Sequence, residues 1–87
     1  MNFGDAKEQI RQKVDIVDLV GSNISLKRAG RNYVGLCFLH DDSKPSLQVN
    51  PERQTWWCYV CSKGGDIFNF VMEREKCDFV EALKILA

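Results

Sequence analysis

The most informative absence in this 87-residue sequence is that of any long apolar run. No segment approaches the roughly 20 apolar residues that a membrane-spanning helix needs. Residues 1–20 contain no unbroken apolar stretch of the kind found in secretory signals. Internal repeats and low-complexity tracts are missing as well. We therefore expect one small domain spanning residues 1–87, located in the cytoplasm and without membrane contact.

Clustered acidic side chains are also absent. Phosphoryl transfer needs several carboxylates that together hold paired metal ions. Only Asp41 and Asp42 stand next to each other, and such a pair is typical of a solvated turn. The chain by itself is therefore expected to be non-catalytic.

Two short motifs of cysteine and histidine dominate what is present. The sequence reads Cys37-Phe-Leu-His40 and, after residues 41–57, Cys58-Tyr-Val-Cys61. A two-residue spacer allows both side chains of one turn to reach the same ion, and thiolates with imidazole suit tetrahedral Zn²⁺. Three thiolates and one neutral imidazole fill all four positions and leave none for an activated water. The spacing therefore predicts one structural zinc ion.

Other roles are open to these cysteines. Disulfides need an oxidising compartment, which the missing secretory signal argues against. A redox-active C-x-x-C motif sits at a strand-to-helix junction, whereas Cys61 is followed by Ser-Lys-Gly-Gly. Buried thiols without a ligand remain an alternative. A helix carries Cys77 about 15 Å from Cys61, so Cys77 is expected to be a half-buried apolar residue between the last two helices.

Hydrophobic periodicity and turn residues predict an α+β fold. A small antiparallel sheet should form a zinc ribbon over residues 23–63, with the metal site at one end. N-terminal helices within residues 1–22 and C-terminal helices within residues 64–87 should flank it. The strands are expected at residues 23–27, 32–36, 45–50 and 55–58, and Gly64-Gly65 is expected to end the sheet pattern.

Aspartates mark the expected helix starts. Asp15 and Asp66 each precede an apolar helical pattern, and Asp78 with Glu81 forms a capping-box pattern. The helices should span residues 5–14, 16–20 and 66–75, with a last one after Asp78. Their core-facing residues are expected to be Ile10, Val14, Val17, Val20, Ile67, Phe70, Val71, Phe79, Leu83 and Leu86.

The net charge of zero conceals an uneven distribution of charged residues. Residues 27–63 carry six basic and three acidic side chains, which leaves this segment at +3, while residues 1–26 and 64–87 are each net acidic. The predicted ribbon is therefore the basic part of the chain.

These motifs resemble the N-terminal zinc-binding domain, a CHC2-type zinc ribbon, of bacterial DnaG-type DNA primases. The resemblance covers about residues 10–87. It departs from the family at Phe38, usually proline, at Val60, usually glycine, and at Ser62, often glycine. The matching segments are Gly30-Arg-Asn-Tyr-Val-Gly-Leu-Cys-Phe-Leu-His40, Lys44-Pro-Ser46, Cys58-Tyr-Val-Cys61, Gly64-Gly-Asp66 and the flanking Val14-Asp-Ile-Val-Asp18 and Phe79-Val-Glu-Ala82.

The resemblance implies a zinc domain that helps a primase engage single-stranded DNA template and select the start of an RNA primer during DNA replication. Nucleotidyl transfer would belong to a separate polymerase domain. The implied partners are the template and that polymerase domain, in cis or in trans, with a replicative helicase reached only through the rest of the parent protein. A second hypothesis is a protein-interaction module that docks on the polymerase domain through the acidic last helices.

The family usually carries an aromatic residue at the position of Trp56 and a polar or basic one at Trp57. Neighbouring strand residues point to opposite faces, so Trp56 is expected in the core and Trp57 on the outer face. If Leu47 and Val49 point inward, then Ser46, Gln48 and Asn50 share that outer face.

Single-strand sites combine a positive track with aromatic faces on which bases stack. The candidates for such contacts are Lys27, Arg31, Tyr33, Lys44 and Trp57. Ordinary packing is the alternative for the two aromatic residues, and solubility is the alternative for the three cations.

Overall fold

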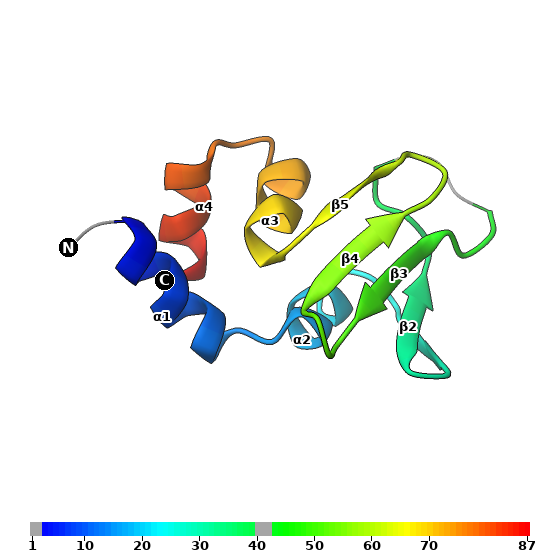
Figure 1. Cartoon of the computed structure of the whole chain (residues 1–87). Coiled ribbons are helices and arrows are strands. Elements are labelled where there is room, and N and C mark those ends of the chain that lie inside the picture. The colour runs from blue at the N-terminus through cyan, green and yellow to red at the C-terminus, as the bar shows by residue number, and fades with distance from the viewer. Residues whose placement is uncertain (1–2, 40–42) are drawn as a thin grey trace.

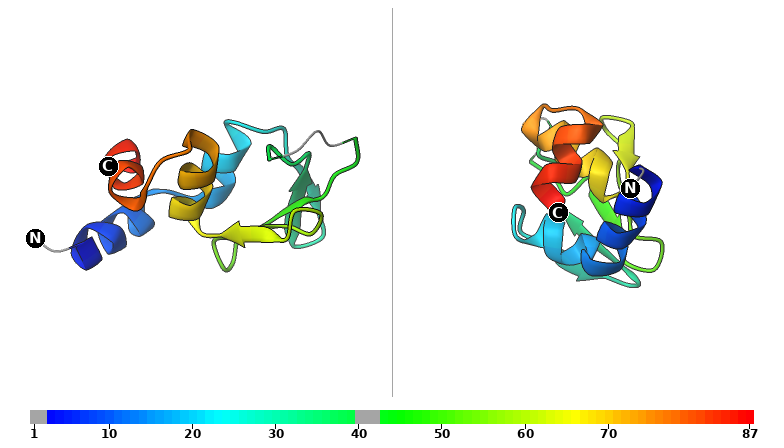
Figure 2. Two further views of the ribbon diagram at one scale, coloured as in Figure 1. Left: turned by 90° about the horizontal axis from the view of Figure 1, so that it is seen from above. Right: turned by 90° about the vertical axis from the view of Figure 1, so that its left-hand side faces the viewer.

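The computed structural model describes residues 3–39 and 43–87, and within them a five-stranded antiparallel sheet and four helices. The molecule is elongated, 42 × 26 × 20 Å, with the sheet at one end and α1 and α4 at the other (Figures 1 and 2). This arrangement confirms the predicted α+β class. The elements are α1 (Phe3–Lys13), α2 (Ile16–Gly21), β1 (Lys27–Ala29), β2 (Asn32–Gly35), β3 (Leu47–Asn50), β4 (Thr55–Cys58), β5 (Lys63–Gly65), α3 (Ile67–Glu75) and α4 (Phe79–Leu86).

The strands lie in the order β1-β2-β3-β4-β5. Residues directly opposite each other on paired strands share a face of the sheet. Val49 lies opposite Trp56 on the inner face, and both are at most 2% exposed. Trp57 lies opposite Gln48 on the outer face and is 49% exposed. The expected placement of the two tryptophans is confirmed.

Two strand boundaries differ from those predicted. The first strand begins at Lys27 instead of residue 23, because the N–H groups of Asn23 and Ile24 both donate to the Val20 carbonyl and prolong the turn after α2. The glycine pair does not end the sheet but lies within β5, which pairs with β4. A β-carbon at Gly64 would lie 2.3 Å from the Trp56 carbonyl oxygen, so only glycine permits this close approach.

The core lies between the inner face of the sheet and the helices. Phe38, Trp56 and Phe70 form an aromatic cluster with ring centroids 4.9 to 6.0 Å apart. Phe38, which stands where the family usually has proline, thereby ties the loop after β2 to α3. Ile16 and Ala82 were not predicted in the core yet are fully buried, whereas Val14, Val17, Phe79 and Leu86 are only partly buried.

The three aspartates cap helices as predicted. Asp15 accepts from the Asp18 N–H, and Asp78 accepts from the Glu81 N–H. The complete capping box is at Asp66, which accepts from the Phe68 and Asn69 N–H groups while the Asn69 side-chain oxygen accepts from the Asp66 N–H. No helix among the described residues has the length and apolar character to cross a membrane.

Gln54 joins the β3–β4 turn to α2. Its Oε1 accepts from the Ile16 N–H at 2.8 Å, and its Nε2 donates to Asp15 Oδ1 at 2.8 Å and to the Pro51 carbonyl at 2.7 Å. Its backbone adopts a positive φ of 56°, which costs a side-chain-bearing residue about 1–2 kcal/mol. Three satisfied hydrogen bonds offset that strain.

Gln54→Ala should lower the free energy of unfolding by about 1–3 kcal/mol, because the α2 N–H loses its partner while the positive φ remains. Gln54→Gly should be less harmful, since glycine adopts this φ without strain. Denaturant titration of the metal-loaded domain measures both, with the exposed Gln12→Ala on α1 as control. Equal losses for the alanine and glycine variants would show that backbone strain is unimportant here.

The turn after Cys61 explains one departure from the family. Ser62 has a φ of 55°, and its N–H donates to the Cys58 carbonyl at 2.8 Å. Glycine, often present here in the family, would adopt this left-handed conformation freely. Val60 is not among the residues with positive φ, so replacing the family's glycine there costs no such strain.

Ser62→Gly should therefore raise the free energy of unfolding by up to about 1 kcal/mol. Ser25→Gly is the matched control, because Ser25 is exposed and has no positive φ, and it should slightly destabilise the fold. The measurement is again denaturant unfolding of the metal-loaded domain. A loss of stability in both variants would contradict the strain at Ser62.

Candidate metal centre

Three cysteines converge at one end of the sheet. Cys58 is the last residue of β4, Cys61 lies in the turn to β5, and Cys37 follows β2. The register places Gly35 opposite Leu47 and Leu47 opposite Cys58, which brings the end of β2 beside the end of β4. Their sulfur atoms all lie within 4.8 Å of one another. The sheet thus assembles ligands that are distant in sequence.

The spacing of the sulfur atoms fits a shared ion. Cys37 Sγ and Cys61 Sγ are 3.8 Å apart, far from the roughly 2.05 Å of a disulfide bond. A tetrahedral zinc with bonds of about 2.3 Å to sulfur places its thiolates about 3.8 Å apart. The donor set and its geometry therefore suit zinc.

Backbone and hydroxyl donors point at the sulfur atoms. The Leu39 N–H donates to Cys37 Sγ at 3.3 Å, and the Cys61 N–H donates to Cys58 Sγ at 3.4 Å. Ser46 Oγ is 3.5 Å from Cys58 Sγ. Ser46 was expected on the outer face but is 2% exposed; it precedes β3, so strand alternation does not govern it. Its hydroxyl faces the thiol instead.

These contacts and the burial of the site shift the pKa values of the three thiols differently. Burial raises the pKa of Cys37 to about 12, with further increases from the neighbouring sulfur atoms. Burial also opposes ionisation of Cys58, yet hydrogen bonds from Ser46 and from backbone N–H groups outweigh it and lower the pKa to about 7. Burial raises the pKa of Cys61 as well. Three thiolates this close need a cation between them, since each negative charge disfavours the next.

The remaining metal-site expectations concern His40 and Cys77. His40, the predicted fourth ligand, lies outside the described residues. Cys77 is half-buried, and its Sγ lies 3.9 Å from the Val71 carbonyl oxygen. It does not belong to the three-cysteine group that could hold a metal among the described residues.

The structure places the five candidates for nucleic-acid contact in different parts of the sheet. Lys27 and Trp57 share the outer face, in one row with Val34 and Gln48. Arg31, in the β1–β2 turn, and Lys44, before β3, are exposed at opposite ends of the strands. Tyr33 was expected on the same surface but lies opposite Val49 on the inner face, where it packs against the core. Its strand parity excludes it from the outer face.

Polar residues on the outer face were not singled out as site residues from the sequence. Together with Trp57 they line a hollow of about 160 Å³. Strand alternation predicts Gln48 and Asn50 on this face, and the structure agrees. Asn32 and Arg53 come from other segments, and only the sheet register and the β3–β4 turn bring them there. The residues of this hollow are Asn32, Gln48, Asn50, Arg53, Thr55, Trp56 and Trp57.

Comparison with known proteins gives relatives along nearly the whole chain. The chain is 51% identical over 80 residues to a DNA primase of Geobacillus stearothermophilus and 46% identical over 80 residues to one of Listeria monocytogenes. Each match covers 92% of this chain and 13% of the relative, so the chain spans only a small part of these proteins. The solved structure of the zinc-binding and RNA polymerase domains of the Aquifex aeolicus primase superposes with a TM-score of 0.88 and 35% identity, over 94% of this chain and 20% of that one.

The family model described as CHC2 zinc finger matches residues 4–87. This range contains the whole sheet, the three converging cysteines and all but the first residue of the described helices. The chain therefore belongs to the CHC2 zinc finger family.

Proposed function

We propose that this chain is the zinc-binding domain of a DNA primase, with one structural zinc ion held by Cys37, His40, Cys58 and Cys61. The convergence of three sulfur atoms within 4.8 Å carries the proposal. A zinc with four protein ligands supplies cross-linking and no open position for chemistry. The ligands would join the loop after β2 to the β4–β5 turn, and the donors from Leu39, Ser46 and Cys61 would orient the thiolates.

Metal removal should unfold the sheet, because apparent zinc binding energies of about 10–16 kcal/mol are also folding energies in small domains. His40→Ala should weaken zinc affinity on the order of 100-fold, since that energy divides over four ligands. Competition with a chromophoric chelator measures affinity, and circular dichroism follows the fold. Cys77→Ser is the matched control and should keep one zinc per chain. Unchanged affinity in His40→Ala would remove His40 from the ligand set.

We further propose that the outer face of the sheet binds single-stranded DNA template and contributes to selecting the primer start site. Trp57 presents an exposed indole in the same row as Lys27, with Arg31 and Lys44 exposed at opposite ends of the strands. Bases stack on such aromatic faces, and cations neutralise the phosphates. The acidic side chains of α3 and α4 lie on the helices, so they do not place negative charge on this face of the sheet. The template would be met in the cytoplasm.

Trp57→Ala should weaken binding of a fluorescein-labelled single-stranded oligonucleotide about five- to 150-fold, the equivalent of one lost stacking contact. Lys27→Gln should reduce the slope of log affinity against log salt by about 0.7. Anisotropy titrations at several salt concentrations measure both. The control is Tyr59→Ala, which removes an exposed aromatic at the zinc end. Equal effects of Trp57→Ala and Tyr59→Ala would contradict a specific stacking site.

Docking on a primase polymerase domain, in cis or in trans, is the second candidate function. Glu75, Asp78 and Glu81 at the end of α3 and the start of α4 are exposed, and an acidic surface of this kind complements a basic surface of a partner. A replicative helicase would be reached only through the rest of the parent protein. If the domain binds no oligonucleotide at low salt but binds the polymerase domain, docking is its function.

A further inference from the structure

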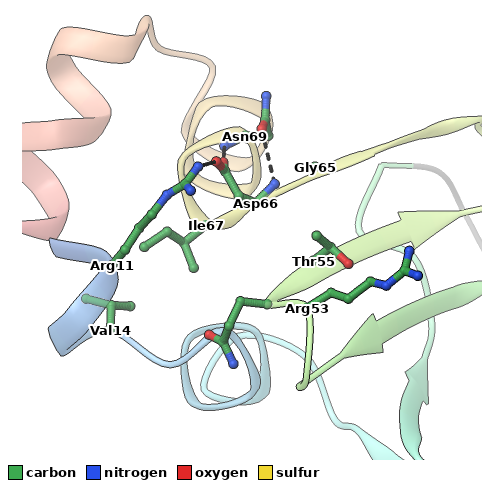
Figure 3. A pocket seen from close by; sticks show the side chains of 9 residues that line it. Arg11, Val14, Arg53, Thr55, Gly65, Asp66, Ile67 and Asn69 are labelled. Atoms are coloured by element: carbon green, nitrogen blue, oxygen red, sulfur yellow. Dashed lines mark hydrogen bonds and ion pairs between the residues drawn. The ribbon is translucent and has the colours of Figure 1, made fainter. Parts of the chain in front are cut away.

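Two hollows of this molecule meet at the β3–β4 turn. The sheet-face hollow, about 160 Å³, lies beside Trp57 on the outer face. The helix-side hollow, about 410 Å³, lies between α1, the β3–β4 turn and the start of α3 (Figure 3). Arg53 and Thr55 line both. A ligand that crosses the turn can therefore occupy both hollows at once.

Arg53 lies at the boundary between the two hollows, and its guanidinium is unpaired among the described residues. Its backbone N–H donates to Asn50 Oδ1 at 3.0 Å, which fixes the turn. Its guanidinium has no ion-pair or hydrogen-bond partner among the residues that the structure describes, and the residue is exposed. Arg11, the other arginine of the helix-side hollow, is instead paired with Asp66. Arg53 is thus the cation of these two hollows that is left for an anionic group.

The sheet-face hollow offers amides beside an aromatic plane. Gln48 and Asn32 each present a donor and an acceptor, the pattern that pairs with the edge of a base. Trp57 lies against β5 because Gly64 has no side chain, and a β-carbon there would lie 2.5 Å from Trp57 Cε3. The indole position is therefore set by the neighbouring strand.

The helix-side hollow combines apolar walls with neutral polar groups. Val14 and Ile67 form its apolar side. Thr55 lies toward the sheet, and Asn69, on α3, lies beside Asp66 (Figure 3). Arg11 offsets the Asp66 charge, which would otherwise repel a phosphate. This lining suits a nucleoside, whose base is apolar on its faces and polar at its edge.

We propose that the two hollows are consecutive nucleoside sites of one bound single strand, with the Arg53 guanidinium holding the phosphate between them. The proposal rests on the outer face binding single-stranded DNA and adds a route off the sheet toward α1 and α3. Gln48 and Asn32 read the base beside Trp57. The second base leaves the sheet and enters the helix-side hollow, so the strand turns at Arg53 instead of continuing across the sheet.

The first test compares Arg53→Gln with Arg74→Gln in the zinc-loaded domain. Arg74 is an exposed arginine of α3 that lines neither hollow, so both variants lose the same charge. Arg53→Gln should weaken binding of a labelled single-stranded oligonucleotide about fivefold or more and lower the salt slope by about 0.7. Arg74→Gln should change neither quantity. Equal behaviour of the two variants, with wild-type binding intact, overturns the proposal.

The second test removes bases from the oligonucleotide. Abasic substitution at each position in turn should weaken binding at two adjacent positions, one of which becomes insensitive in Trp57→Ala. Gln48→Ala should reduce the preference among the four bases at that position, which amide readout sets at about five- to 150-fold. Sensitivity at a single position, or at two separated positions, overturns the route through Arg53. Absence of all binding at low salt would instead overturn the single-strand function itself.

Discussion

Mutual repulsion among three thiolates is the constraint around which this domain is built. Their sulfur atoms lie within 4.8 Å of one another. Hydrogen bonds from Ser46 and from backbone N–H groups lower the pKa of Cys58, whereas burial raises the pKa of Cys37 in spite of the Leu39 N–H that donates to its sulfur. A bound cation removes this repulsion and stabilises the close approach of β2, β4 and the β4–β5 turn. The fold brings three thiolates close together, and a bound zinc ion would neutralise the repulsion between them.

The rest of the molecule supports this end through a short chain of contacts. Trp56, two residues before Cys58, packs on Phe38 and Phe70 and donates its indole N–H to the Asp66 carbonyl at 3.0 Å. Asp66 in turn caps α3 and pairs with Arg11 of α1. Strand β4 therefore connects the sulfur cluster, the aromatic core and the first helix. Its next residue, Trp57, faces the other way, so one strand serves the core and the outer surface.

Local signals in the sequence predict much of this architecture. The aspartate caps and the alternation around Trp56 each act over a few residues, and the structure agrees with them. Two of the errors arise where residues distant in sequence determine the structure. Tyr33 faces inward because β2 pairs with β3 in one particular register. Gly64 lies in a strand because its missing side chain makes room for a neighbour.

Sequence patterns do not predict side-chain contacts between residues that are distant in the sequence. Nothing around Ser46 indicates that its hydroxyl meets Cys58, and nothing around Gln54 indicates that its amide caps a helix 38 residues earlier. Arg53 reads as one surface cation among six in its segment, and only the β3–β4 turn places it between two hollows. Sequence patterns predict the secondary-structure elements and the cysteines that converge, whereas strand register and turns determine the surface.

The elongated shape has a mechanical consequence. The start of α1 and the end of α4 lie near each other, at the opposite end of the long axis from the turn between β4 and β5 (Figures 1 and 2). A tether attached at either end of the chain would therefore hold the domain by its helices and leave the ribbon at the far end, free of the tether. Small rotations at the attachment point would sweep the ribbon through a wide arc, so tether stiffness would govern where the ribbon makes contact.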